Sequence, residues 1–320
     1  MPMTPIFSPS TGGAAIRYGR AGELVFLTNT NAGAVTERMR IHTSGNVGIG
    51  VNSPAATLDV DGTIKLDGNY PVGSGNVALG DLALDAVTSS GNYNVAIGTG
   101  ALTNSTSATY NVAVGYYGGQ SYTTGGYNTC LNAYSGNNTT TGTHNLNLGY
   151  ASGYSTTTGA GNVCVGNYAG YAHTTGSYST YAGYQAGYSN TTGLYNTYIG
   201  AYSGYTATTA QYNACVGYYS GFGLTTNGYH AFLGYYAGSN STGTAYGNVC
   251  VGYNAQAGGT TNAAGNQRHT SVVLGYNCLG VGTGYVTIGT GSGTSRIYSQ
   301  FGATSSPVWE RSSDRRYKKD

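Results

Sequence analysis

Between residues 76 and 252 the hydrophobic pattern repeats every 17 residues, with a small or aliphatic residue directly before a glycine. The residues before the glycine are Leu79, Ile97, Val114, Leu131, Leu148, Val165, Ala182, Ile199, Val216, Leu233 and Val251. The glycines on the 17-residue period are Gly98, Gly115, Gly149, Gly166, Gly183, Gly200, Gly217 and Gly234. Asn132 fills the one remaining position, and Gly80 and Gly252 lie one residue off the period. A period of this length predicts a solenoid of stacked coils.

The few residues before each glycine predict a short strand. Side chains one and three residues before the glycine share a face of that strand, because side chains alternate along it. We expect stacked coils to bury these aliphatic side chains against each other. A second glycine follows four residues later in eight successive repeats and predicts a bend with positive φ. These glycines are Gly119, Gly136, Gly153, Gly170, Gly187, Gly204, Gly221 and Gly238.

The predicted fold class is therefore all-β: an elongated repeat solenoid, either a β-roll or a triple β-helix, with 17-residue coils in a trimeric fibre. The content of 55 glycines and 33 tyrosines suggests a disordered low-complexity tract as the alternative. The strict 17-residue period argues against disorder, because a flexible segment does not require one. Three chains are expected because aliphatic strands can close around a threefold axis and leave no sheet edge exposed. The period does not decide whether each chain coils on itself or three chains intertwine.

The expected divisions are an N-terminal β module at 1–68, the repeats at 69–252, a distal tip or cap at 253–312, and a short segment at 313–320. Charges occur only near the two ends of the chain, with none between Asp85 and Arg268, and the formal net charge is +2. No basic stripe is present for nucleic acid. The sequence also has neither a secretory signal pattern nor a stretch long enough to span a membrane.

Chemical sites are scarce in the repeats. Cys130, Cys164, Cys215 and Cys250 share the position two residues before the glycine, in coils too far apart for disulfides, and predict small buried groups. No cofactor or metal is indicated, since clustered ligands are missing from the sequence. The repeats beyond Asp85 hold no pair of carboxylates for glycosidase chemistry, and their histidines are isolated.

Two end segments resemble bacteriophage tail fibres. The segment from Glu37 to Gly50, with Ser53-Pro54 and 58–62 after it, resembles the shaft segment ahead of tail-fibre repeats. The segment 312–320 resembles the start of the intramolecular chaperone domain of endosialidase-type tail spikes and fibres. That resemblance implies trimerisation followed by self-cleavage, with Ser313 as nucleophile and Lys318 as its base. The sequence ends at Asp320, so we expect this pair to be inactive here.

The repeat motif itself resembles the heads of trimeric autotransporter adhesins, which share the pattern of Asn94-Val95-Ala96-Ile97-Gly98. The resemblance covers about five positions of each coil. It implies a trimeric β-roll or β-helix.

Tyrosines recur one and two residues after the glycine and again five before it, which predicts aromatic ladders. Their structural role is stacking, and the functional alternative is a sugar-binding face. Threonine pairs such as Thr123-Thr124 predict a second strand edge with hydroxyl ladders. The receptor-binding candidates are Arg268, His269, Arg296, Trp309, Tyr116, Tyr117, Tyr218, Tyr219, Tyr235 and Tyr236.

These features together predict a phage tail fibre protein, part of the virion, that adheres to a bacterial surface receptor such as a glycan as a non-enzymatic homotrimer. Its N-terminal module is expected to bind other tail or baseplate proteins. The alternatives are a bacterial or extracellular surface adhesin or filament protein, and a polysaccharide-degrading tail spike.

Overall fold

The structure is a computed structural model that describes residues 14–18, 22–29, 35–61, 72–226, 228–241, 246–257, 271–282, 284–291, 295–300 and 310–311. These residues form strands and turns, and no helix occurs among them. The chain divides into two units, Met1–Asp67 and Gly68–Asp320.

The first unit contains a five-stranded sheet in the order β1-β2-β3-β4-β5. Its strands are β1 (Ala14–Tyr18), β2 (Leu24–Asn29), β3 (Val35–Ile41), β4 (Val47–Ile49) and β5 (Leu58–Val60). Strands β1 to β4 are antiparallel, and β5 pairs with β4 in parallel.

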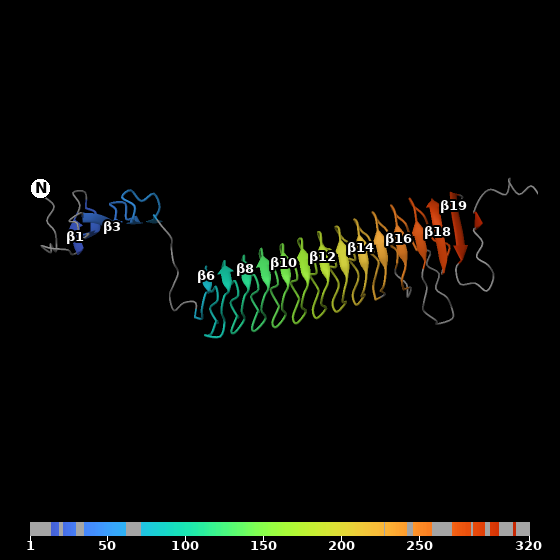
Figure 1. Ribbon diagram of the computed structural model, residues 1–320, viewed down its shortest axis with the longest axis horizontal. Helices are drawn as coiled ribbons and strands as arrows, with labels where there is room; N and C mark the ends of the chain where they lie inside the picture. Colours follow the sequence, from blue (N-terminus) through green and yellow to red (C-terminus); the bar gives the residue numbers. More distant parts are fainter. Residues whose placement is uncertain are drawn as a thin grey trace, which may run out of the picture. The chain divides into compact units, whose positions relative to one another are not determined.

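The second unit is a β-solenoid, as the sequence predicted. Its 15-stranded sheet follows chain order from β6 to β20, and Figure 1 shows the strands as a row of short arrows joined by loops. The strands are β6 (Val77–Leu79), β7 (Val95–Ile97), β8 (Val112–Val114), β9 (Thr129–Leu131), β10 (Leu146–Leu148), β11 (Val163–Val165), β12 (Thr180–Ala182), β13 (Thr197–Ile199), β14 (Ala214–Val216), β15 (Ala231–Leu233), β16 (Val249–Val251), β17 (Val272–Leu274), β18 (Tyr285–Thr290), β19 (Ser295–Gln300) and β20 (Glu310–Arg311).

Consecutive strands of the one chain are hydrogen-bonded neighbours, so the chain coils on itself. Strands β6 to β18 are parallel and in register; Asn147, for example, pairs with Cys130 on one side and Cys164 on the other. Hydrogen bonds between coils continue through the turns, as from the Gly170 amide to the Ala186 carbonyl at 2.9 Å. Strands β19 and β20 then pair antiparallel and end the sheet.

The middle residue of each strand from β7 to β17 faces the core. These residues are Ala96, Ala113, Cys130, Asn147, Cys164, Tyr181, Tyr198, Cys215, Phe232, Cys250 and Val273, none more than 1 % exposed. The prediction that the cysteines at this position are buried is confirmed, and they are free thiols. Burial raises the pKa of Cys164 to about 12, so this thiol stays protonated and unreactive near neutral pH.

The prediction that stacked coils bury the aliphatic residue before each glycine is wrong for the chain by itself. Exposed fractions at this position are 47 % for Leu79, 37 % for Ile97, 39 % for Leu131, 40 % for Ile199 and 53 % for Leu233. Each coil contributes one three-residue strand to a narrow interior, and only the middle residue of that strand points into it, beside buried residues of the turns such as Leu102 and Tyr122. The residues on either side of that middle residue must then point outward, because side chains alternate along a strand.

A continuous ladder of buried polar side chains runs through the second unit. Its members, four residues before the glycine, are Asn76, Asn94, Asn111, Asn128, Asn145, Asn162, Ser179, Asn196, Asn213, His230, Asn248 and Ser271. Each backbone amide donates to the side chain of the preceding member, as from Asn162 to Asn145 Oδ1 at 3.0 Å. The Asn145 amide group in turn donates to the Gly159 carbonyl at 2.8 Å. The ladder thus satisfies buried polar groups in every coil without using charge.

The threonine positions form a hydroxyl ladder but no second strand. The Thr140 hydroxyl donates to the Thr157 carbonyl at 3.2 Å, and the Thr157 hydroxyl donates to the Thr174 carbonyl at 3.2 Å. The backbone here forms bends instead of a strand. The expectation of a second strand edge is therefore wrong, because each threonine hydroxyl bonds the next coil along the solenoid axis.

Both glycine positions are explained by the backbone. Gly170, in the second set, has φ of +59°, which confirms the predicted bend. Gly166, on the 17-residue period, has φ of +129°, and a Cβ atom there would lie 2.6 Å from the carbonyl oxygen of Gly183. Neighbouring coils therefore approach too closely at this position for a side chain.

Candidate functional site

Two surfaces of the solenoid carry side chains that the fold does not bury. The first is the outward face of the parallel sheet, which we call the aliphatic stripe. It consists of Val77, Leu79, Val95, Ile97, Val112, Val114, Thr129, Leu131, Leu146, Leu148, Val163, Val165, Thr180, Ala182, Thr197, Ile199, Ala214, Val216, Ala231, Leu233, Val249, Val251, Val272, Leu274, Val286 and Ile288, all exposed or half-buried. An uncharged apolar surface that follows a sheet from β6 to β18 is typical of a site where another molecule packs.

The second surface consists of tyrosine rows. Five residues before the glycine, rings of successive coils stack face to face, with centroids 4.9 Å apart for Tyr93 and Tyr110 and 5.2 Å for Tyr195 and Tyr212. His144 takes a place in this row and stacks on Tyr127 at 5.0 Å. These contacts confirm the predicted ladder. Because the rings cover each other's faces, the row offers mainly ring edges to solvent.

The rings after the glycine are arranged differently. A zigzag run alternates between the first and second positions after the glycine: Tyr116, Tyr134, Tyr150, Tyr168, Tyr184, Tyr202 and Tyr218. Successive rings of the run meet edge to face, at 5.3 Å and 76° for Tyr150 with Tyr168 and at 6.1 Å and 90° for Tyr202 with Tyr218. After Tyr218 the geometry changes to parallel stacks, and Tyr235 lies over Tyr253 at 5.0 Å and 3°.

Three phenols of the zigzag run are held in their neutral form. Partial burial, followed by the neighbouring tyrosines, raises the pKa of Tyr168, Tyr202 and Tyr218 above the ordinary value. These hydroxyl groups are therefore protonated at neutral pH and can donate as well as accept hydrogen bonds.

The structure places the six candidate tyrosines on equivalent turns in two separate groups, Tyr116 with Tyr117 and the four from Tyr218 to Tyr236. Tyr116, Tyr117, Tyr218, Tyr219, Tyr235 and Tyr236 all lie on the turn that follows the strand. Arg296 lies apart from them in β19, where its Nη1 donates to the Leu279 carbonyl at 2.5 Å. Arg268, His269, Trp309, Ser313 and Lys318 lie outside the described residues. The alternation of the zigzag run was not predicted, although the tyrosine, alanine and asparagine residues one position after the glycine carry that signal.

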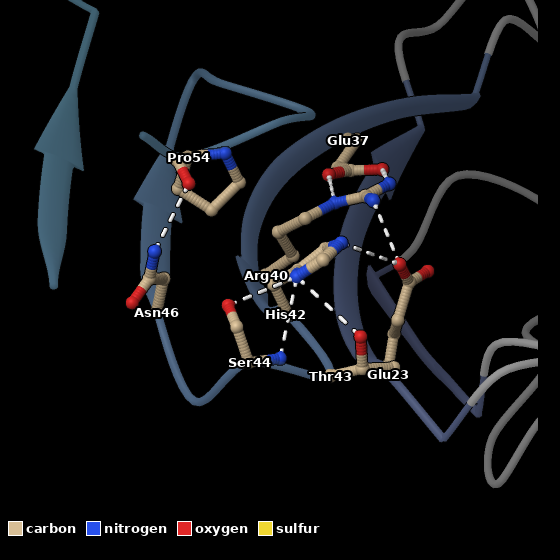
Figure 2. A network of polar contacts seen from close by, with 8 residues as sticks. All are labelled: Glu23, Glu37, Arg40, His42, Thr43, Ser44, Asn46 and Pro54. Atoms are coloured by element: carbon tan, nitrogen blue, oxygen red, sulfur yellow. Dashed lines mark hydrogen bonds and ion pairs between the residues drawn. The ribbon is translucent and has the colours of Figure 1, made fainter. Parts of the chain in front are cut away.

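Charged side chains of the first unit pair with one another, as Figure 2 shows. Arg40 Nη2 donates to Glu37 Oε2 at 2.7 Å, and Arg40 Nη1 lies 3.3 Å from Glu23 Oε1. The hydrogen bond to Glu37 raises the pKa of Arg40 above its usual value. His42 Nε2 lies 3.5 Å from the same Glu23 oxygen. The network joins β3 to the residue that precedes β2, and it is best explained as a structural clamp.

The other candidate chemistry is buried. His173 donates from Nε2 to the Gly176 carbonyl at 2.8 Å, and its Nδ1 lies 3.2 Å from the Tyr181 hydroxyl. Among the described residues, no three His, Cys, Asp or Glu side chains gather as metal ligands would. The same part of the chain has no helix of the length and apolarity that a bilayer crossing requires.

Comparison with known proteins finds no matching family model, no matching curated protein and no matching solved structure.

Proposed function

We propose that this chain forms the shaft of a non-enzymatic homotrimeric fibre that adheres to a glycan on a bacterial surface, as a bacteriophage tail fibre does. The observation that carries the proposal is the aliphatic stripe. An isolated chain leaves this face in water, whereas copies of the chain can cover it for each other.

The repeat makes identical copies suitable partners for one another. Every coil presents the stripe at the same position, so chains with parallel axes match coil for coil around a threefold axis. No charge between Asp85 and Arg268 opposes the close approach of equal surfaces. Such an assembly leaves the remaining sides of each coil for contact with a receptor.

The attachment of the fibre follows from the resemblances at its ends. The first unit would bind other tail or baseplate proteins. The segment at 312–320 would begin the removable chaperone that brings three chains together, and these resemblances support a location in the virion.

Sedimentation equilibrium of the full chain tests the assembly. We expect three times the 32.7 kDa chain mass. The triple variant Ile97→Lys, Leu131→Lys and Ile199→Lys should sediment as a monomer, because like charges would face one another across the interface. The matched control, Thr124→Lys, Thr158→Lys and Thr192→Lys, places the same charges at exposed turn positions and should remain trimeric. A monomeric wild-type chain contradicts the proposal.

Adhesion is tested separately with labelled protein and bacterial cells. The wild type should bind intact cells of a susceptible strain and should lose binding after their surface glycan is stripped. Binding that survives the stripping would instead indicate a protein receptor.

A further inference from the structure

The face-to-face tyrosine ladder lacks a ring at one position between residues 93 and 229. Five residues before the glycine, the nine successive coils from β7 to β15 hold Tyr93, Tyr110, Tyr127, His144, Gly161, Tyr178, Tyr195, Tyr212 and Tyr229. Gly161 thus divides the eight rings into two groups of four. The rings on either side of it belong to His144 in the preceding coil and Tyr178 in the following coil.

The backbone does not require a glycine at this position. Gly161 has φ of +67°, and His144 and Tyr178 adopt the same left-handed conformation, with φ of +59° and +58°. The nearest atoms to a Cβ added at Gly161 all belong to the ring of Tyr178, with Cδ1 at 2.8 Å. At Gly159, by contrast, a Cβ would overlap the backbone carbonyl oxygen of Gly176. A small shift of the Tyr178 ring would therefore admit a tyrosine at position 161, and the fold does not account for the missing ring.

The two rings beside the gap each have an uncovered face. His144 stacks on Tyr127 at 5.0 Å, on the side away from the gap. Tyr178 stacks on Tyr195 at 5.5 Å, also on the side away from the gap. No other ring contacts either of them in the part of the chain that the structure describes. Tyr178 is accordingly 62 % exposed, against 47 % for Tyr195, whose ring is covered on both faces.

The gap has the size of one flat ring. His144 and Tyr178 are two coils apart, which places their ring centres about 10 Å apart, since stacked strands repeat at ~4.8 Å. A ring midway between them would lie about 5 Å from each, within the range of stacked aromatic pairs. The ladder shows the same fit, because Tyr127 lies between Tyr110 and His144 at 4.9 and 5.0 Å. A puckered saturated ring is thicker than a flat one and would force the two walls apart.

We propose that this gap, which we call the Gly161 slot and which is bounded by His144, Gly161 and Tyr178, binds one flat, uncharged aromatic ring of a small molecule. The ring inserts edge first and stacks on both walls, in the place that a tyrosine takes in other coils. The ligand is uncharged because no Asp, Glu, Lys or Arg occurs between Asp85 and Arg268 to pair with a charge. The inference does not depend on the proposed function.

Titration with p-cresol, followed by nuclear magnetic resonance, tests the slot. We expect a dissociation constant on the order of 1 mM, because so small a ligand makes few contacts. The Cε1 proton of His144 should shift upfield as the ligand ring covers the imidazole. The matched ligand 4-methylcyclohexanol carries the same substituents on a puckered ring and should bind about tenfold more weakly, since it gains no aromatic stacking. Equal affinity for the two compounds, or no binding of p-cresol, overturns the inference.

A second test moves the gap along the ladder. Gly161→Tyr should fill the slot and abolish binding. Gly161→Ala, the matched control, adds the same positive-φ strain without a ring and should keep the affinity within about threefold of the wild type. The double variant Gly161→Tyr with Tyr212→Gly has the composition of the wild type and opens an equivalent gap between Tyr195 and Tyr229. It should bind p-cresol about as tightly as the wild type.

The variants also show whether p-cresol binds elsewhere. Binding to Gly161→Tyr at wild-type affinity would place the ligand on another surface, such as the aliphatic stripe, and overturns the inference. A double variant that keeps the sedimentation and circular dichroism of the wild type but binds no p-cresol overturns it as well, because a gap between two stacked rings would then not suffice. Equal loss of binding in Gly161→Ala and Gly161→Tyr would assign the effect to the backbone, which also contradicts a ring-sized slot.

Discussion

The two units of this chain satisfy their polar groups by different means. In the first unit, Arg40 pairs with Glu37 and Glu23 in a network of opposite charges. In the second, the ladder from Asn76 to Ser271 uses neutral side chains that bond from coil to coil. The difference follows from repetition, because equal charges stacked ~4.8 Å apart would repel, whereas equal amides donate and accept in turn.

The comparison also explains where each unit is vulnerable. A charge pair involves few residues and is screened by salt. A ladder places every member between two others, so a change in one coil leaves groups of neighbouring coils unpaired. We therefore expect substitutions in the solenoid to cost more than comparable substitutions in the first unit.

The largest effect is expected at the glycines. Gly166→Ala should lower the free energy of unfolding of the second unit by about 4 kcal/mol, because positive φ strain adds to the clash with Gly183. Gly45→Ala in the first unit should cost only about 1 kcal/mol, since φ is +86° but no atom lies within 4 Å of the added Cβ. Hydrogen exchange measured separately for each unit reports both values, and equal costs would contradict close packing of the coils.

The next effect is expected in the asparagine ladder. Asn145→Ala should cost about 3 kcal/mol, because the Asn162 amide and the Gly159 carbonyl both lose their partner. Asn145→Ser should cost less, since Ser179 already serves as an acceptor in the ladder. In the first unit, Asn46→Ala removes one bond to Pro54 and should cost about 1 kcal/mol. Exchange of the Asn162 amide during a denaturant titration distinguishes the two Asn145 variants, and amide exchange in the first unit measures the cost of Asn46→Ala.

The third effect concerns pH. Burial lowers the pKa of His173, so below the ordinary value of about 6.5 the unfolded chain binds more protons than the folded one. The stability contributed by neutral His173 is complete above that pH and should fall by at most about 1.4 kcal/mol per pH unit below it. The His173→Asn variant should lack this dependence, so its free energy of unfolding should differ from that of the wild type by an amount that changes with pH below about 6.5. Parallel curves for the variant and the wild type would show that His173 does not titrate on unfolding.

The smallest effect is expected for the charge network. Arg40→Met should destabilise the first unit by about 1 kcal/mol or less, because partly exposed ion pairs contribute little. Molar salt should weaken the wild-type first unit by a similar amount and should not weaken the solenoid. Comparable salt sensitivity of the two units would contradict the contrast between charged and neutral pairing.

Much of the solenoid could be predicted because period and chemistry agree in every coil. The strands, the bend at Gly170, the buried cysteines and the face-to-face tyrosine ladder all follow from residues that recur at one position. The burial of Ile97 and its equivalents could not be predicted correctly, because both faces of these strands are apolar. Alternation assigns residues to faces but does not say which face is inside.

The tyrosine rows of the candidate site were likewise predictable only in part. The sequence identifies Tyr116 and Tyr218 as members of a row, but it does not distinguish an edge-to-face run from a stack. That distinction depends on the residue in the neighbouring coil, which is 17 positions away and becomes a contact only when the coils stack.

The sequence by itself determined the coil length, the single short strand in each coil and the uncharged character of the stack, because each is a property of the repeat. The tertiary structure decided which strand face is enclosed and which becomes the aliphatic stripe. It did so because the interior of a 17-residue coil has room for one side chain from each strand. The repeat period does not specify the volume of this interior, which is set only when the chain closes on itself.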